Sequence, residues 1–300
     1  GLVHSRNLVS VRLLQEMNVG YGVRYVERFG FPMQHVPPDL SLSLGTEELT
    51  PLEMARGYGV FASGGYLLTP YLIARVEDHD GRLLYARAPE LACEDCGNAA
   101  SRLQPAQGPS WLTDHPPIAL GGADFVPEPA RSAPRVMDGR TTYLMTSLMQ
   151  DVIRRGTGQY ALRLNRPDVA GKTGTTNGLR DAWFAGYTPD LVAVTWVGFD
   201  LARSLGRGES GSVTATPIWT SYMSRALKEV PHRTIDLPPG VVAVWVSAAT
   251  GTRTSLDDPA GHYEYFRADM LPPEAVNEGP GEASGSTATP IRQEELRDLF

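Results

Sequence analysis

Three strand-like segments follow one another with very short connections, at residues 168–175, 181–187 and 191–199. Their apolar and aromatic content is typical of strands. The last two are joined only by Thr-Pro-Asp at 188–190, a loop short enough for an antiparallel hairpin. This succession restricts the fold more than any other feature of the chain. We interpret the aromatic residues of these strands as core packing: Trp183, Phe184, Tyr187 and Trp196.

The first seventy residues show the helical spacing of apolar side chains instead. The clearest start signal is Thr50, an N-cap residue that is followed by Pro51 and by Glu53, which is placed to return the cap. The signal predicts a helix to about Phe61, because Ser-Gly-Gly at 63–65 ends it.

Two more helices are predicted on either side of the strand-like segments. Residues 141–155 end in two arginines, and Gly156 follows them as a helix end. Residues 216–229 begin with Thr-Pro, which we interpret as a helix cap. The first of these helices has a predicted apolar face of Tyr143, Leu144, Leu148 and Val152. Helices combined with a largely antiparallel sheet predict an α+β fold.

A hairpin and an insertion are predicted between these helices. Asp-Gly at 80–81 is a turn signal between residues 66–76 and 82–86. Residues 88–134 contain many prolines and no sustained periodicity. We interpret them as an insertion or long surface loop.

The C-terminal part predicts a smaller unit. Residues 241–246 and 262–266 could pair as an accessory sheet. Beyond Ala268 the composition is rich in Pro, Gly, Glu, Ser and Thr, so residues 269–300 are expected to be a disordered tail. The predicted division is therefore a main domain over 1–235, an accessory segment over 236–268, and the tail.

Charge and apolar content exclude two classes of partner. The formal net charge of the 300 residues is −7 with no basic run, which argues against binding a nucleic acid. The best apolar run has nine residues, at 191–199, whereas a membrane-spanning helix needs about 18 or more. Because the chain starts at Gly1 without a signal-peptide pattern, we expect a piece of a longer protein, anchored through an upstream segment.

The two cysteines, Cys93 and Cys96, lie in the proline-rich stretch. The six histidines are scattered without paired spacing, so no metal site and no cofactor are expected. Two interpretations of the cysteine pair stay open: a local disulfide in an oxidising compartment, or two inert thiols.

Lysine is rare in this chain, since only Lys172 and Lys228 occur among 27 basic residues. Lys172 lies in Gly-Lys-Thr-Gly-Thr at 171–175, where a lysine could simply be a solvated charge. A phosphate-binding loop is excluded because its first glycine would fall on Arg166. A nucleophile-elbow hydrolase is excluded because the nearest match, at 208–212, lacks the final glycine.

Ser5 and Asn7 open the first predicted helix, and such a triplet alone is usually only a cap. Together with Lys-Thr-Gly at 172–174, and in this order, it resembles two of the three signatures of the penicillin-binding protein and serine β-lactamase superfamily. Asp-Ala-Trp-Phe-Ala-Gly-Tyr at 181–187 and Trp-Val-Gly-Phe-Asp at 196–200 look like the transpeptidase domain of the bifunctional, class A proteins. The resemblance covers roughly residues 1 to 230.

The resemblance implies a β-lactamase/transpeptidase-like fold and a peptidoglycan D,D-transpeptidase. A serine attacks the D-Ala-D-Ala carbonyl of a stem peptide and forms an acyl-enzyme, and an amine of a neighbouring strand then takes the acyl group. Stem peptides are the implied substrates and β-lactams the implied inhibitors. Ser5 would carry a proton toward the leaving nitrogen, Asn7 would fix the peptide and the base, and Lys172 would supply positive charge.

The strand that carries Lys172 is implied to bind the substrate. The hydroxyls of Thr173 and Thr175 would bond the terminal carboxylate, and Gly174 would let an extended peptide lie along the strand. The N–H of Thr175 would form half of an oxyanion hole. Gly211 and Ser212 are expected near the same cleft.

One departure from the family pattern concerns the nucleophile, which the family carries in Ser-x-x-Lys upstream of Ser-x-Asn. The residues three positions before the two lysines are Val169 and Arg225, so the motif is absent. We interpret this as truncation, with the nucleophile, its lysine base, the first strands of the sheet and a glycosyltransferase domain preceding Gly1. The implied place is the periplasmic face of a bacterial inner membrane.

Two alternatives remain at this stage. A D,D-carboxypeptidase or β-lactamase of the same fold would use water as the acyl acceptor. A non-catalytic penicillin-recognising or scaffold domain would need no nucleophile. An intact upstream Ser-x-x-Lys would distinguish an enzyme from a scaffold.

Overall fold

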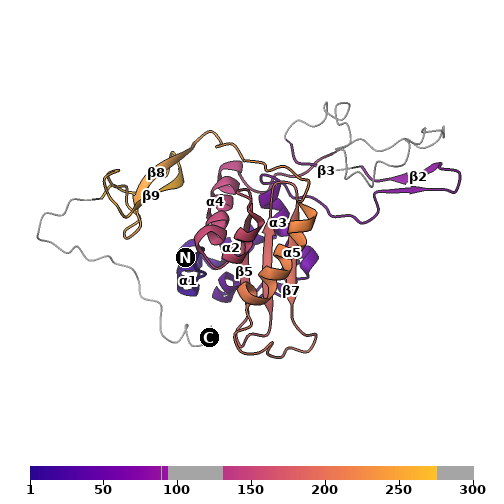
Figure 1. Ribbon diagram of the computed structural model, residues 1–300, viewed down its shortest axis with the longest axis horizontal. Helices are drawn as coiled ribbons and strands as arrows, with labels where there is room; N and C mark the ends of the chain where they lie inside the picture. Colours follow the sequence, from indigo (N-terminus) through magenta and orange to yellow (C-terminus); the bar gives the residue numbers. More distant parts are fainter. Residues whose placement is uncertain (89, 94–130, 276–300) are drawn as a thin grey trace, which may run out of the picture.

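The computed structural model describes residues 1–88, 90–93 and 131–275, and within these ranges the chain is an α+β structure (Figure 1). Its main sheet contains three antiparallel strands in the order β5 (Ala170–Thr175), β6 (Ala182–Tyr187), β7 (Val192–Val197). The three predicted strands and their antiparallel pairing are confirmed. Five α-helices accompany the sheet in the described ranges: α1 (Asn7–Met17), α2 (Val19–Glu27), α3 (Pro51–Ala62), α4 (Gly139–Arg155) and α5 (Thr216–Ala226).

Side chains of β6 alternate between two faces of the sheet, and helices pack on both. Phe184 is fully buried, and its ring centroid lies 4.8 Å from that of Trp219 in α5. Tyr187 points to the opposite face, where its ring stacks on Phe61 of α3. Its hydroxyl lies 2.8 Å from that of Thr146 in α4. The sheet is therefore the middle layer between α5 and the pair α3 and α4.

The helix predicted from Thr50 is confirmed with its capping box. The Thr50 hydroxyl accepts from the Glu53 backbone N–H at 3.2 Å, and the Glu53 carboxylate accepts from the Thr50 N–H at 2.7 Å. The helix ends at Ala62, one residue beyond the expected end. Short 3-10 helices lie at Met33–His35, Leu40–Leu44 (η2) and Gln159–Leu164 (η5).

Helix α4 occupies the expected range, but the apolar face predicted for it is wrong in part. Val152 is fully buried, whereas Tyr143, Leu144 and Leu148 are only partly buried. The more deeply buried side of this helix carries Thr142, Thr146, Ser147, Met149 and Ile153. Polar side chains can occupy it because they have partners: Thr146 bonds to Tyr187, and the Thr142 hydroxyl donates to the Asp138 carbonyl.

Thr216 is not the N-cap residue that its Thr-Pro sequence predicts. A single π-helical turn, η6 (Gly211–Ala215), runs directly into α5, so Thr216 lies inside the continuous helix. Its buried hydroxyl donates to the Gly211 carbonyl at 2.8 Å. α5 also ends earlier than expected, at Ala226.

The interpretation of the strand aromatics as core residues holds for Phe184 and Tyr187 but not for the two tryptophans. Trp196 is 38% exposed, and its indole N–H donates to the Asp181 carboxylate at 3.0 Å. Trp183 is partly buried and packs against Trp196 with ring centroids 6.1 Å apart. Trp183 and Trp196 lie on the same face of the sheet as Tyr187. Helices α3 and α4 cover that face near Tyr187 and leave the end with the tryptophans uncovered.

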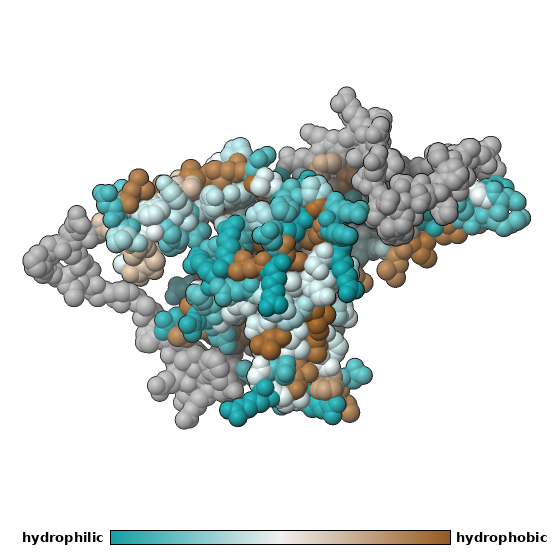
Figure 2. Space-filling model, in the orientation of Figure 1, coloured by the Kyte–Doolittle hydropathy of each residue, from teal (hydrophilic) through white to brown (hydrophobic). Residues whose placement is uncertain are grey.

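A hairpin projects from the layered body (Figure 1). It pairs β1 (Arg75–Glu77) with β2 (Leu83–Ala86) around the predicted Asp-Gly turn, and its first strand begins later than residue 66. Hydrophobic surface follows this arm in Figure 2, where Leu72, Ile73 and Leu84 are exposed. Next to it, β3 (Glu90–Leu91) pairs in parallel with β4 (Arg131–Ser132). The rest of the predicted insertion, residues 94–130, lies outside the described residues.

The accessory sheet is confirmed as an antiparallel pair of β8 (Val241–Ser247) and β9 (Gly261–Arg267). It contacts α4 through Tyr265 and Tyr143, whose rings meet edge to face at 5.2 Å. The division into segments 1–235 and 236–268 stays a prediction. The tail expected from residue 269 is wrong at its start, because the Arg253 N–H donates to the Pro273 carbonyl and the Ala275 N–H donates to the Arg253 carbonyl. The rest of the expected tail, after residue 275, lies outside the described residues.

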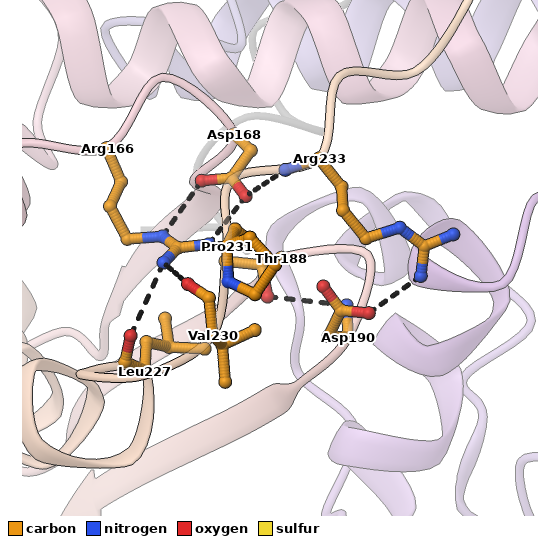
Figure 3. A network of polar contacts seen from close by, with 8 residues as sticks. All are labelled: Arg166, Asp168, Thr188, Asp190, Leu227, Val230, Pro231 and Arg233. Carbon is orange, nitrogen blue, oxygen red and sulfur yellow. Dashed lines mark hydrogen bonds and ion pairs between the residues drawn. The ribbon is translucent and has the colours of Figure 1, made fainter. Parts of the chain in front are cut away.

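A buried ion pair fastens the chain between α5 and the accessory sheet to the main sheet (Figure 3). Arg166 and Asp168 form this pair at 2.8 Å, with side chains only 6% and 1% exposed. The Arg166 guanidinium also donates to the carbonyls of Leu227, Val230 and Pro231, and the Asp168 carboxylate accepts from the Arg233 N–H. Every charge of the pair is thereby hydrogen-bonded, which a buried ion pair requires.

Candidate active site

The free edge of β5 is the base of the candidate site. The Thr176 N–H donates to the Asp181 carbonyl. This bond sets the residues of β5 whose backbone groups are hydrogen-bonded to β6. Because the bonding alternates along an antiparallel pair, Lys172 and Gly174 bond to β6, whereas the backbone groups of Thr173 and Thr175 point away from it. β5 is the end strand of the three, so those groups face its open edge.

The N-terminal segment is held beside this edge. Val3, only 7% exposed, accepts through its carbonyl from the Thr157 N–H at 3.3 Å. Gly156 permits this approach, because a Cβ there would lie 2.3 Å from the Val3 oxygen. Two backbone bonds, from Ser5 N–H to Leu2 and from Arg6 N–H to Gly1, close a turn that ends at α1. Figure 1 shows this end of the chain beside α4.

Ser5 and Lys172 are in direct contact. The Lys172 ammonium donates to the Ser5 hydroxyl at 2.9 Å and to the Thr173 carbonyl at 2.9 Å. Folding thus brings these two residues of the signature segments within hydrogen-bond range, and their catalytic roles stay a prediction. Burial lowers the pKa of Lys172 to about 8, so this amine can both hold and release a proton near neutral pH.

Ser5 is not a helix cap. The N-cap residue of α1 is Arg6, and no side chain caps this helix. Ser5 itself has a φ of 52°, the left-handed region that a residue other than glycine rarely adopts. Such strain is typical of functional positions, and here it accompanies the contact with Lys172.

Asn7 is the first residue of α1 and is exposed. Within the described part of the chain, no hydrogen bond joins its side chain to Ser5, Lys172 or Thr173. The structure therefore brings together Ser5 and Lys172, whereas the Asn7 side chain, two positions after Ser5, is not bonded to either of them.

The two threonines after Lys172 have protein partners that the sequence did not indicate. The Thr173 hydroxyl lies 2.6 Å from the hydroxyl of Thr157. The Thr175 hydroxyl accepts from the Gly211 N–H at 3.0 Å. No acceptor for the Thr175 hydroxyl proton is present among the described residues, so this proton is available to a ligand.

Gly211 and Gly174 allow the close packing at this end of β5. A Cβ on Gly211 would lie 2.4 Å from the carbonyl oxygens of both Gly174 and Trp183. A Cβ on Gly174 would lie 3.1 Å from the Trp183 Cβ, so the space above Gly174 is partly taken by that side chain. The expected proximity of Gly211 to the strand is confirmed.

Thr157 and Gly156 are site residues that sequence reasoning missed. The Gly-Thr pair directly after α4 was the available signal, because a glycine after a helix can mark a close backbone approach as well as a helix end. Its partners, Val3 and Thr173, cannot be identified without the fold.

Other kinds of site are not formed in the described ranges. No group of three or more His, Cys, Asp and Glu side chains there could hold a metal ion. No helix in those ranges has the length and apolar character needed to cross a membrane. Cys93 is in a disulfide, which rules out the interpretation of the cysteines as two inert thiols.

The chain is similar to proteins of one family in sequence and in structure. The family model described as "Penicillin binding protein transpeptidase domain" matches residues 1–223. Penicillin-binding protein 1A of Pseudomonas aeruginosa is 42% identical over 296 residues, which is 95% of this chain and 36% of that protein. The chain thus spans about a third of the length of this relative.

Solved structures agree with this similarity. The crystal structure of penicillin-binding protein 1A from Haemophilus influenzae has a TM-score of 0.75 at 34% identity, over 91% of this chain and 40% of that one. The structure of PonA1 from Mycobacterium tuberculosis in complex with penicillin V has a TM-score of 0.52 at 22% identity, over 76% and 58%, and supports the fold alone. The contact between Ser5 and Lys172 therefore lies within a recognised domain, and the chain belongs to the penicillin-binding protein transpeptidase domain family.

Proposed function

We propose that this chain forms part of a peptidoglycan D,D-transpeptidase, which links stem peptides through a serine acyl-enzyme and is acylated by β-lactams. The observation that carries the proposal is the 2.9 Å hydrogen bond from the Lys172 ammonium to the Ser5 hydroxyl. It joins two of the family's signature segments, in a chain whose family is established by its sequence.

In this proposal, Ser5 relays a proton to the leaving nitrogen. A hydroxyl that accepts from an ammonium keeps its own proton for donation. When Ser5 gives that proton to the leaving group, Lys172 can replace it, because burial brings the pKa of this amine to about 8. The family role of Asn7, to orient the peptide and the base, is part of the same proposal.

The open edge of β5 binds the peptide. Its outward backbone groups suit an extended chain that adds to the sheet as a further strand. The Thr175 N–H lies among these groups and would donate to the oxyanion, an interaction worth roughly 10²–10³ in turnover. Hydroxyl protons of Thr173 and Thr175, together with the Lys172 charge, would receive the terminal carboxylate.

The attacking serine and its lysine base are supplied by a Ser-x-x-Lys segment outside these 300 residues. The proposal rests on the sequence, in which Val169 and Arg225 stand three positions before the two lysines. The substrate is a component of the bacterial cell wall, so we place the reaction on the periplasmic side of the inner membrane.

The test compares two lysine variants in a protein that joins this chain to a Ser-x-x-Lys segment, which we call the acylating form. Lys172→Ala should slow acylation by a labelled penicillin at least a hundredfold. Lys228→Ala, in an exposed position after α5, should be acylated at the same rate as the unaltered protein. Equal rates for the two variants would contradict the proposal. Transfer of the acyl group to an amine rather than to water, followed by mass spectrometry, distinguishes transpeptidase from carboxypeptidase.

A further inference from the structure

Thr157 lies next to the candidate site but has no part in the chemistry proposed above. It follows α4 in the turn that leads to η5. Its hydroxyl oxygen lies 2.6 Å from that of Thr173, sixteen positions later, at a partly buried place. Because Thr173 directly follows Lys172, Thr157 is one hydrogen bond away from the site.

The backbone of Thr157 holds the N-terminal segment that carries Ser5. Its N–H donates to the carbonyl of Val3, two positions before Ser5. Val3 is buried, and Gly156 cannot accept a side chain without displacing the Val3 carbonyl. Thr157 is therefore the residue that connects the Ser5 segment to the Lys172 strand through one backbone and one side-chain bond.

Either hydroxyl of the pair can be the donor, and an acceptor at the edge of the strand would select one of the two arrangements. Each threonine hydroxyl has one proton to donate and can accept two hydrogen bonds. Among the described residues, neither hydroxyl of the pair has a second hydrogen-bond partner. When Thr157 donates, the Thr173 proton is free for an acceptor at the edge of the strand. A carboxylate would take that proton most strongly, and polarisation along the chain of hydroxyls would strengthen the bond.

We propose that Thr157 is a positioning residue of this site, which turns the Thr173 hydroxyl toward an incoming carboxylate and holds the Ser5 segment against Lys172. The carboxylate part rests on the proposed function. The holding part depends only on contacts within this chain.

The holding part can be measured on the 300-residue chain because it contains only two lysines. Selective isotope labelling of lysine gives one NMR signal from Lys172 and one from Lys228, and each can be titrated. Thr157→Val keeps the β-branched shape but removes the hydroxyl. We expect it to loosen the contact with Ser5 and admit water, which raises the Lys172 pKa by about 0.5 or more toward the ordinary lysine value. Thr157→Ser, which restores the hydroxyl, should restore the titration of the unaltered chain.

The chain offers a matched control in a second pair of threonine hydroxyls. The hydroxyl oxygens of Thr250 and Thr252, after β8, lie 2.7 Å apart at an exposed place. Thr250→Val should leave the Lys172 titration unchanged, and Lys228 should titrate alike in every variant. If Thr157→Val fails to fold, Thr173→Val breaks the same pair from its other end and should give the same shift. An unchanged Lys172 pKa in the folded variant, or an equal change with Thr250→Val, would overturn the holding part.

The carboxylate part is tested with a peptide ending in D-Ala-D-Ala and the same peptide as its C-terminal amide. The unaltered chain should bind the acid more tightly than the amide, as followed by the Lys172 signal. Thr157→Val should lose roughly tenfold in affinity for the acid and leave the amide unaffected. Acid and amide binding alike in the unaltered chain would count against the proposed function itself. A clear preference for the acid that Thr157→Val retains would overturn only the role of Thr157.

Discussion

The ammonium of Lys172 lies 2.9 Å from the hydroxyl of Ser5, although 167 positions of sequence separate them. The contact depends on the antiparallel sheet, which places Lys172 on an edge strand, and on the bond from Thr157 to Val3, which holds the start of the chain beside that edge. Neither local segment would create it alone. The contact between Ser5 and Lys172 therefore forms only when the edge strand, the turn after α4 and the start of the chain are folded together.

The charge of Lys172 predicts a pH dependence of carboxylate binding. Because burial lowers its pKa to about 8, the ammonium loses its charge as the pH rises through that value, where an ordinary lysine stays charged. Affinity for a D-Ala-D-Ala peptide should therefore fall as the pH rises through about 8, as measured by calorimetric titration of the chain. Lys172→Arg keeps its charge over this range and should remove the decline, even if its affinity is lower. An affinity of the unaltered chain that is constant across this range would contradict the assignment.

The Arg166–Asp168 pair predicts loss of stability in acid. Burial alone would raise the pKa of Asp168, but the hydrogen bonds and charge of Arg166 and the Arg233 N–H hold it below its usual value. A carboxylate with a lowered pKa stabilises the fold fully above its unfolded pKa of about 4, and this stabilisation is lost as the pH falls through the folded value. Asp168→Asn should remove this part of the acid dependence.

The same variant should also destabilise the chain at neutral pH, because it leaves the Arg166 charge buried and unpaired. The expected cost is about 3–5 kcal/mol in the free energy of unfolding, measured by urea denaturation. Asp257→Asn, in an exposed turn, is the control and should change stability by less than about 0.5 kcal/mol. A similar small effect for both variants would show that the pair does not fasten the accessory segment.

The sequence predicted those parts of the fold that local patterns determine. The strands at 168–199 carry β-branched and aromatic residues between clear turn residues, and Thr50 has every element of a capping box within four positions. Burial on α4 was predicted poorly because Thr146 is polar, and its partner Tyr187 is 41 positions away. Thr216 has the local sequence of a cap, but the π-helical turn before it makes that cap unnecessary.

In the candidate site too, local patterns were predicted from the sequence and long-range contacts were not. Ser5 and Lys172 were found through the spacing of two short triplets that resemble a family's signatures. Thr157 was missed because neither of its partners, Val3 and Thr173, is close to it in sequence. A hydroxyl pair between a helix end and a strand is a property of the folded structure, so no periodicity indicates it.

The disulfide at Cys93 is expected to be dispensable for acylation. Cys93 follows β3, where its carbonyl accepts from the Ser132 hydroxyl, and it belongs to neither signature segment. Cys93→Ser together with Cys96→Ser should leave the rate of acylation of the acylating form by labelled penicillin within about twofold of the unaltered protein. Loss of acylation in a double variant that retains its folded circular dichroism spectrum would assign the insertion a role in the site.

Gly211 should be the glycine at which a methyl group harms the site most directly. Its N–H donates to the Thr175 hydroxyl, and a Cβ there would meet two backbone carbonyl oxygens at 2.4 Å, neither of which can rotate away. Gly211→Ala should therefore push the π-helical turn off β5, slow acylation of the acylating form more than about tenfold and cost roughly 1–3 kcal/mol of stability. Gly59→Ala in α3 is the matched control, because no atom lies within 4 Å of its Cβ position and alanine favours a helix. If Gly211→Ala acylated and melted like Gly59→Ala, the close approach at Thr175 would not be needed for the arrangement of the edge strand.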